Sequence, residues 1–403
     1  MGAVARRSAL SSLELQGHRR HKPDYWLLIL AVLLLTVGLI VVYAISPGLA
    51  VEKHVSGNFF VTRQLVAIAL GFVVFGTTAM VPLGWWRKAG VPLLVVAAGA
   101  TLCALALPQS AQYPAHRWIR VGGLSFQSVE LLKFALLVWL AEFLRIRISA
   151  GTISNWRRTL RPLGICLLVV GVVVASVQRD FGSMIVIAAI AGIMAFVAGM
   201  PMRPVLVAAG CAALLAALVI SAVPYRRARI AAFLHQGSTA NCASLTSGYQ
   251  ACQALIAVGS GGVFGLGLGK SVQAFGYLPE AENDSIFAIY AEKFGFVGVA
   301  VLLGLLLAFF SRIKRTMDRA PDEFTRLLVA GVLAWLAIQS FINIGAMVGL
   351  LPLKGITLPF ISYGGTSVLF VMAAVGLVCN ISRYTLYAAP RQPTATRQRG
   401  RVV

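Results

Sequence analysis

Charged residues are scarce in this chain of 403 residues. Asp, Glu, Lys and Arg together make up only 12 % of the sequence, whereas hydrophobic residues make up 59 %. A soluble core of this size does not need so many apolar side chains. The composition therefore excludes an ordinary soluble globular protein and predicts a polytopic membrane protein.

Acidic residues are the scarcer of the two charged kinds. The chain has 13 Asp and Glu against 35 Lys and Arg, which gives a formal net charge of +22. Nucleic-acid binding would need a folded basic face, and the basic residues lie in short tails and loops instead, so we expect no nucleic-acid partner. Most of them fall in the two tails and in alternate loops. This positive-inside pattern predicts that both termini are cytoplasmic.

Cysteine is also infrequent, with six residues in the chain. Four of them lie in apolar stretches, where a small apolar thiol is ordinary. Cys242 and Cys252 both lie in a predicted outer loop, which is an oxidising place in many bacteria. The sequence leaves open whether these two form a disulfide or remain free thiols.

Ten apolar stretches are long enough, or nearly so, to cross a hydrocarbon layer of roughly 30 Å. We expect an all-α fold with ten transmembrane helices in a domain over 23–388, between disordered basic tails at 1–22 and 389–403. The first stretch has no small-residue cleavage site after a short apolar core, so a cleaved signal peptide is not expected. The stretches lie at about 25–45, 59–82, 91–108, 128–144, 163–178, 182–200, 203–223, 286–311, 327–350 and 367–382.

One long segment separates two of these stretches, the seventh and the eighth, at about 224–285. It contains three acids, Glu280, Glu282 and Asp284, directly before the chain turns apolar again. A carboxylate at the point where a loop re-enters the bilayer is costly unless it is used. We interpret this extracytoplasmic loop as the floor of an active site and Asp284 as its catalytic base. The three acids are also candidate ligands for a divalent cation such as Mg2+ or Mn2+.

The glycine run GSGGVFGLGLGKS in this loop does not fit a nucleotide-binding motif. Phe264 stands where a P-loop needs its first glycine, and no strand precedes the run. Small residues suit a close-packed re-entrant turn instead. Lys270, at the end of the run, either reaches an anionic headgroup or is a structural lysine at the interface.

Other predicted outer elements carry charges of both signs at a similar depth. Such charges tend to face a cavity or one another rather than lipid. Each set also has a structural interpretation: Glu130 and Lys133 can neutralise each other at i,i+3, Arg179 and Asp180 can cap two helices, and the arginines after the seventh stretch can simply be solvated. The candidates for substrate binding are Arg117, Arg120, Glu130, Lys133, Asp180, Arg226, Arg229, Lys270, Glu280, Lys354 and Tyr363.

The last predicted outer segment, 349–367, is rich in proline and glycine and contains Lys354 and Tyr363. This composition favours a broken, re-entrant segment that lines a cavity. A rigid turn between two spans is the alternative. Asn343, within the ninth stretch, is more typical of a hydrogen bond between helices than of a ligand contact.

Five motifs in this order make the chain resemble the SEDS family (shape, elongation, division and sporulation), bacterial membrane enzymes that polymerise peptidoglycan. The motifs are HRWIRVGGLSFQSVELLK, QRDFGS, SGYQACQALIAVGSGGVFGLGLGKSVQ, YLPEAENDSIFA and NIGAMVGLLPLKGITLPFISYGGTS. The resemblance covers 24 to about 387, and two of the motifs look more like the division members than the elongation members. The chain departs from the family where Glu282 and Asn283 replace the usual His-Thr and where two motifs lack their proline.

The resemblance implies ten transmembrane helices with both termini inside and an essential acid at the position of Asp284. It implies a peptidoglycan glycosyltransferase of the bacterial inner membrane, at the division septum, that polymerises lipid II. Its partners would be a class B penicillin-binding protein transpeptidase and other membrane proteins of the division complex. Asp284 would take the proton of the acceptor sugar hydroxyl, and the cationic candidates would stabilise the leaving undecaprenyl pyrophosphate. The alternatives are an elongation-type polymerase, a flippase that moves lipid II without making a bond, and a scaffold that only recruits the transpeptidase.

Overall fold

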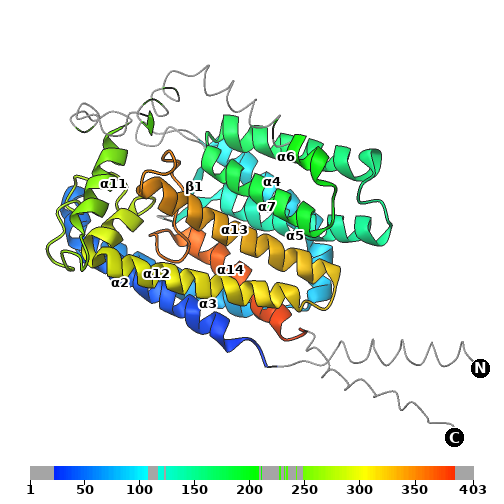
Figure 1. Ribbon diagram of the computed structural model, residues 1–403, viewed down its shortest axis with the longest axis horizontal. Coiled ribbons are helices and arrows are strands. Elements are labelled where there is room, and N and C mark those ends of the chain that lie inside the picture. The colour runs from blue at the N-terminus through cyan, green and yellow to red at the C-terminus, as the bar shows by residue number, and fades with distance from the viewer. Residues whose placement is uncertain are drawn as a thin grey trace, which may run out of the picture.

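The computed structural model describes residues 22–107, 117–121, 124–207 and 248–385, together with the single residues 210, 227, 231, 233, 234 and 242. This part of the chain is mainly helical (Figure 1). Its helices are α2 (Tyr25–Glu52), α3 (Phe59–Met80), α4 (Leu83–Ala106), α5 (Ser128–Ser149), α6 (Arg161–Val172), α7 (Phe181–Val197), α11 (Tyr249–Ser260), α12 (Ile286–Asp318), α13 (Glu323–Met347) and α14 (Gly365–Ser382), with π-helical turns η1 (Trp156–Leu160) and η2 (Val173–Val177) on either side of α6.

Seven helical segments among the described residues are long and apolar enough to cross a membrane. They are α2, α3, α4, the α6 segment with its flanking turns (Trp156–Ala175), α12, α13 and α14. α7 is apolar but shorter, and α5, which carries charged residues at both ends, is not among the seven. A helix lies at each of the other nine predicted spans; of the seventh, at about 203–223, residues 203–207 are helical and most of the rest is outside the described residues. The count of ten therefore stays a prediction.

The prediction of an entirely α-helical chain was wrong in one place. Strands β1 (Trp118–Val121) and β2 (Leu124–Gln127) form an antiparallel hairpin in which Val121 lies opposite Leu124. The sequence between them is Gly122–Gly123, a pair typical of two-residue hairpin turns. The sequence pattern that predicts this hairpin spans only a few residues, and the long apolar stretches on both sides of it dominated the prediction.

Several helices extend further than their apolar stretches, α4 and α12 among them. α4 starts at Leu83 rather than near 91, and α12 continues to Asp318 rather than ending near 311. Hydropathy detects only the part of a helix in the hydrocarbon, roughly 30 Å thick, whereas the headgroup regions widen the bilayer to about 40–45 Å. Charged residues at these helix ends therefore stay in the helix without belonging to the apolar run.

α13 and α14 form the centre of the bundle (Figure 1). Their most apolar windows are 72 % and 83 % buried, against 22 % for α3 and α12. α14 packs mainly against α3, and α13 packs against α7 and α12. The apolar side chains that the outer helices leave exposed are those that a bilayer would cover, because lipid tails are as apolar as Leu.

The bundle has two chemically different ends. One, which we call the Asp284 end, contains the start of α12 and the last residues of α2 and α13. The other, the Asp24 end, contains the start of α2 and the end of α14: the Asp24 N–H donates to Ser382 Oγ at 3.0 Å, and Arg312 donates to the Asp24 carboxylate at 2.6 Å. Figure 1 shows α2 and α12 running side by side between the two ends.

The segment between α13 and α14 folds back into the bundle. Its Phe360 is 2 % exposed, and the Phe360 ring centroid lies 5.1 Å from that of Phe309 in α12. On the other side, the Phe360 backbone packs on Gly38 of α2, where an added Cβ would lie only 2.5 Å from the Phe360 carbonyl oxygen. This geometry agrees with the predicted broken, re-entrant segment rather than with the rigid turn.

The glycine run packs against a break in α12. Gly295 interrupts that helix with φ 63° and ψ −165°. The N–H groups of Leu266 and Gly267 donate to the carbonyls of Glu292 and Lys293 at 2.9 and 3.0 Å. A Cβ on Gly265 would lie 2.1 Å from the Lys293 carbonyl oxygen. The predicted close-packed turn is confirmed, and its glycines serve backbone approach rather than phosphate binding.

Candidate active site

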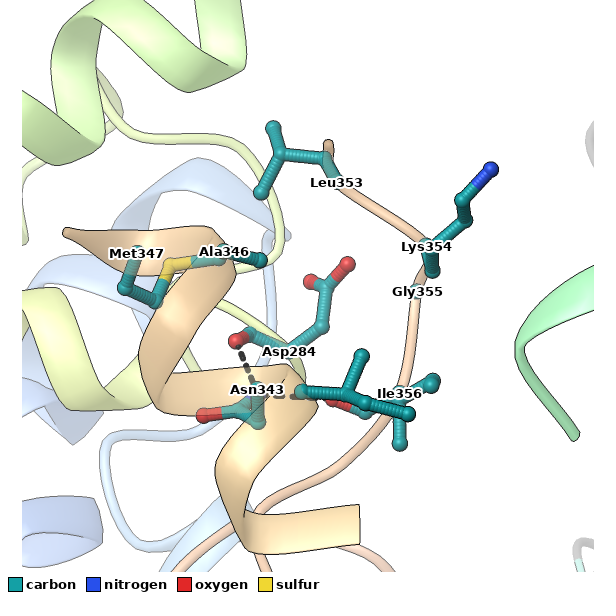
Figure 2. A pocket seen from close by; sticks show the side chains of 9 residues that line it. Asp284, Asn343, Ala346, Met347, Leu353, Lys354, Gly355 and Ile356 are labelled. Atoms are coloured by element: carbon teal, nitrogen blue, oxygen red, sulfur yellow. Dashed lines mark hydrogen bonds between the residues drawn. The ribbon is translucent and has the colours of Figure 1, made fainter. Parts of the chain in front are cut away.

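Asp284 lies in the turn that leads into α12, and its side chain is only 8 % exposed. It lines a pocket with about 180 Å³ of empty space, part of it open to solvent. Figure 2 shows the Asp284 carboxylate between α13, which contributes Asn343, and the segment that contains Lys354 and Gly355. Lys354, which is far from Asp284 in the sequence, also lines this pocket, but its side-chain nitrogen points away from the Asp284 carboxylate in Figure 2.

Hydrogen bonds to the backbone fix the turn that contains Asp284. The Asn343 amide donates to the carbonyls of both Asp284 and Ile356 at 2.7 Å (Figure 2). Ser362 Oγ donates to the Asn283 carbonyl at 2.7 Å, and the Tyr363 N–H donates to the Glu282 carbonyl at 2.8 Å. The structural role predicted for Asn343 is confirmed, but it joins two loops rather than two helices.

Two glycines allow the pocket wall to approach its neighbours. Gly355 has φ +65°, and a Cβ there would lie 3.8 Å from Asp284 Oδ2, so this part of the wall leaves the carboxylate uncovered. Gly182, in the first turn of α7, packs on the outer side of the same wall. A Cβ at Gly182 would lie 2.5 Å from Ile356 Cγ1 and 2.9 Å from the Lys354 carbonyl oxygen.

Gln250 of α11 was missed by the sequence analysis. Its Nε2 lies 3.3 and 3.4 Å from the two carboxylate oxygens of Asp284 and 3.0 Å from Ser285 Oγ. Two residues further on, Cys252 forms a disulfide with Cys242, with a Cα–Cα distance of 5.4 Å. The disulfide interpretation is therefore confirmed. Glutamine is too common in loops for its type alone to have predicted this contact.

The side chains of the three acids in this turn contact different partners and do not gather at one site. Glu282 is buried and forms an ion pair with Lys53 at the end of α2. Glu280 is exposed and accepts from Asn283 Nδ2 at 2.5 Å. Among the described residues, no group of three or more His, Cys, Asp or Glu is placed to hold a metal ion. The residues present do not fit the divalent-cation site considered from the sequence, and we derive no catalytic step through a metal.

Lys53 and Tyr363 lie beside the turn and have shifted pKa values. Burial lowers the pKa of Lys53, but the hydrogen bond that Lys53 donates to Glu282 and the charges of nearby glutamates outweigh burial and raise this pKa overall. Burial raises the pKa of the Tyr363 hydroxyl, and the charge of Arg63 only partly offsets it. The Tyr363 ring packs edge-on against Phe60, with centroids 5.4 Å apart. Tyr363 thus supports the Lys53–Glu282 pair rather than lining the pocket.

Glu130 and Lys133 lie deeper in the bundle, both almost completely buried in α5. Lys133 Nζ donates to Glu130 Oε1 at 2.8 Å and to Gln339 Oε1 of α13 at 2.9 Å. The Gln339 amide in turn donates to the Thr357 carbonyl at 3.0 Å. The pair does neutralise itself, and it is also connected to the pocket wall through Gln339.

Several other predicted binding residues have backbone partners. Arg117 donates to the carbonyl of Gln178 at 2.8 Å and to that of Arg179. The Asp180 carboxylate caps α7 by accepting from the Ser183 N–H at 3.0 Å. These contacts explain why the residues are needed structurally, and their binding of substrate stays a prediction.

The remaining candidates are not gathered at the pocket. Arg120 lies exposed in β1, and Lys270 lies exposed after the glycine run. Arg226 and Arg229 fall outside the described residues. Of the cations proposed from the sequence, Lys354 is the one that lines the Asp284 pocket in the described part of the chain.

These features define a helical membrane protein with a buried carboxylate at a small pocket at one end of its bundle. The chain matches the model of the FtsW/RodA/SpoVE family, described as cell cycle protein, over residues 25–387, and it belongs to this family. It is 37 % identical over 372 residues to the probable peptidoglycan glycosyltransferase FtsW of Saccharophagus degradans, covering 91 % of this chain and 94 % of the relative. It is 38 % identical over 374 residues to the stage V sporulation protein E of Bacillus subtilis, covering 92 % and 99 %.

Solved structures with the same fold agree with this assignment. A chain of a peptidoglycan synthase complex that coordinates polymerization and crosslinking superimposes with a TM-score of 0.73 at 25 % identity, covering 90 % of this chain and 98 % of the other. The rod shape determining protein RodA of Thermus thermophilus gives a TM-score of 0.64 at 25 % identity, covering 90 % and 97 %.

Proposed function

We propose that this protein is a peptidoglycan glycosyltransferase that polymerises lipid II during septal wall synthesis, with Asp284 as general base. The observation that carries the proposal is the buried Asp284 carboxylate at a pocket that Lys354 also lines. The curated relatives named as peptidoglycan glycosyltransferases FtsW support the reaction and the division role.

The proposed topology has ten transmembrane helices in the bacterial inner membrane, with both termini in the cytoplasm. The Asp24 end then faces the cytoplasm, which is consistent with its basic residues Arg87, Arg312 and Arg326. The Asp284 end faces outward, where lipid II carries its sugars. A disulfide at that end fits an oxidising compartment.

In the proposed reaction, Asp284 removes the proton from the 4-hydroxyl of the acceptor sugar. The freed oxygen attacks the anomeric carbon of the donor while the bond from that carbon to undecaprenyl pyrophosphate breaks, so the anomeric centre inverts. Such a positioned base contributes roughly 10²–10⁴-fold. The pyrophosphate leaves with its negative charge, and the proposed cation for its stabilisation is Lys354, because this residue lines the pocket.

The position of Asp284 suits a base. It directly precedes Ser285, the N-cap of α12, and the partial positive charge at a helix N-terminus favours an ionised carboxylate. Asn343 holds the backbone and leaves the carboxylate turned to the pocket (Figure 2). A carboxylate fixed in this way needs little reorganisation when it accepts a proton.

The proposed partner is a class B penicillin-binding protein transpeptidase within the division complex. The similarity to a chain of a synthase complex supports this pairing. The assay should therefore use the protein co-reconstituted with such a partner, because the isolated subunit can lack activity for want of the complex alone.

The test is polymerisation of labelled lipid II by the reconstituted pair. We expect Asp284→Asn to lower the rate at least about 10²-fold, as expected when a general base is lost. Asp318→Asn is the matched control, since it removes one exposed carboxylate at the Asp24 end and should leave the rate unchanged. Polymer formation by Asp284→Asn at the normal rate would contradict the base assignment. Absence of polymer from the unaltered pair, together with movement of lipid II across vesicles, would favour the flippase instead.

A further inference from the structure

The contact of Gln250 with Asp284 joins two parts of the outer loop that are far apart in sequence. Gln250 Nε2 lies within hydrogen-bonding distance of both Asp284 carboxylate oxygens, of Ser285 Oγ and of the Pro279 carbonyl, at 3.3, 3.4, 3.0 and 3.5 Å. α11, the helix that contains Gln250, packs against α12. One amide group therefore bridges α11 to the whole turn that holds the base.

A covalent bond fixes the same part of α11. The Cys242–Cys252 disulfide closes the chain around the first turn of the helix, two residues from Gln250. Buried apolar contacts anchor the helix further on, at Ala254 and Ala257. The N-terminal turn, where Gln250 lies, has the disulfide as its covalent restraint.

We propose that Gln250 is a positioning residue for the Asp284 carboxylate and that the Cys242–Cys252 disulfide holds Gln250 in place. This inference rests on the proposed function of Asp284. An amide N–H that donates to an ionised carboxylate fixes its rotamer and favours its charged form. Gln250 therefore keeps Asp284 oriented toward the pocket and in the ionised form that a general base needs before it takes a proton.

Loss of the Gln250 donor should change the pH dependence of the reaction. Among the described residues, the charged groups on the elements around Asp284 include Lys354 on the pocket wall, Glu280 and Glu282 in its own turn, and Lys53, which pairs with Glu282. None of these is altered by Gln250→Leu. The acid limb of the kcat/KM profile should therefore move to higher pH, because the charged form of Asp284 loses a donor.

The first experiment measures lipid II polymerisation by the reconstituted pair with Gln250→Leu, Gln250→Asn and Gln253→Leu. We expect Gln250→Leu to lower kcat about tenfold, as for a hydrogen bond to a charged group, and to shift the acid limb upward. Gln250→Asn should fall between it and the unaltered protein, and Gln253→Leu, on the same helix, should change neither quantity. A lower rate with an unshifted acid limb would indicate a packing role and overturn the inference.

The second experiment tests the disulfide through a double-mutant cycle. Cys242→Ser should lower kcat several-fold alone and have little further effect in the Gln250→Leu background, because coupled residues are not additive. Treatment with a water-soluble phosphine should match Cys242→Ser: the disulfide gains two electrons and two protons to give two thiols, and the phosphine takes oxygen from water to become its oxide. Additive losses would overturn the link between the disulfide and Gln250.

Asp284→Asn separates this inference from the proposed function. If Asp284→Asn is inactive but Gln250→Leu behaves like the unaltered protein, the positioning role alone is wrong. If Asp284→Asn polymerises at the normal rate, the proposed base is wrong, and with it the reason for positioning.

Discussion

The two ends of the bundle use charged residues in different ways. At the Asp24 end, ion pairs lie on regular helix ends and are partly exposed. Asp322 caps α13 through a capping box, and Lys314 pairs with Asp318 at i,i+4 with side chains 62 % and 50 % exposed. Such arrangements stabilise helix ends at little cost, because the charges remain solvated.

At the Asp284 end, charges are buried and the backbone is strained. The Lys133 and Glu130 side chains are 2 % and 5 % exposed, and Glu282 is 3 % exposed. Three of the four described non-glycine residues with positive φ also lie at this end, namely His54, Arg179 and Glu280; the fourth, Phe360, lies where the segment between α13 and α14 folds back into the bundle. Buried charges and left-handed non-glycine residues each cost free energy and persist where the surrounding structure fixes them.

The comparison shows that contacts with a free-energy cost are concentrated at one end of the molecule. One end is built from caps and solvated pairs that any stable helical bundle uses. The other holds strained turns and desolvated charges around the Asp284 pocket. A chain that needed only to cross a membrane would gain nothing from the second arrangement, which is why we place the chemistry there.

The largest difference in stability between the two ends is expected when a buried cation is removed. Lys133→Met leaves the Glu130 carboxylate in the bundle without its lysine, and removal of one partner of a buried pair costs about 3–5 kcal/mol. Lys314→Met, at the Asp24 end, breaks an exposed i,i+4 pair with Asp318 and should cost no more than about 1 kcal/mol. Unfolding in detergent, followed by circular dichroism, measures both.

A second substitution provides the control for Lys133→Met. Combining it with Glu130→Leu removes the stranded charge and should restore much of the lost stability, because apolar replacement of a whole buried pair is often neutral. If the double variant is as unstable as Lys133→Met, the loss comes from Gln339 and packing rather than from an unpaired charge.

The next largest effect contrasts two left-handed glycines. Gly265, at the Asp284 end, has φ +80°, and a Cβ there meets the Lys293 carbonyl at 2.1 Å; Gly199, at the Asp24 end, has φ +75° and open space around it. Alanine costs about 1–2 kcal/mol for backbone strain at either site. Gly265→Ala should cost about 1–3 kcal/mol more, because the helix must move. Equal decreases in melting temperature for the two variants would show that close packing of the glycine run against α12 does not add to stability.

Much of the fold follows from the sequence because apolar runs directly measure where a helix can lie in lipid. The limits are local: α4 begins among charged and aromatic residues that hydropathy scores poorly, and the β1–β2 hairpin is too short to stand out. The direction of successive helices across the membrane stays a prediction, which rests on the alternation of loops with many Lys and Arg and loops with few.

The candidate site was only partly predictable. Asp284 could be found because an acid directly before an apolar stretch is unusual, and its neighbour Lys354 came from a motif. Gln250 could not, because its contact depends on how α11 packs on α12. The backbone contacts of Arg117 and Asp180 could not be predicted either, because sequence does not reveal which backbone groups of a turn need a side-chain partner.

The smallest expected effect is the pH dependence of the Lys53–Glu282 pair. The raised pKa of folded Lys53 means that its contribution to stability is complete below the unfolded value of about 10.4 and is lost as pH rises through the folded value. Because the Lys53 side chain is 42 % exposed, this pH-dependent part should not exceed about 1 kcal/mol. The difference in melting temperature between the unaltered protein and Lys53→Met should therefore be constant from pH 7 to 9 and shrink above about pH 11. A difference that grew with alkaline pH would mean that Glu282 is stabilised by other groups and that Lys53 is not its counter-charge.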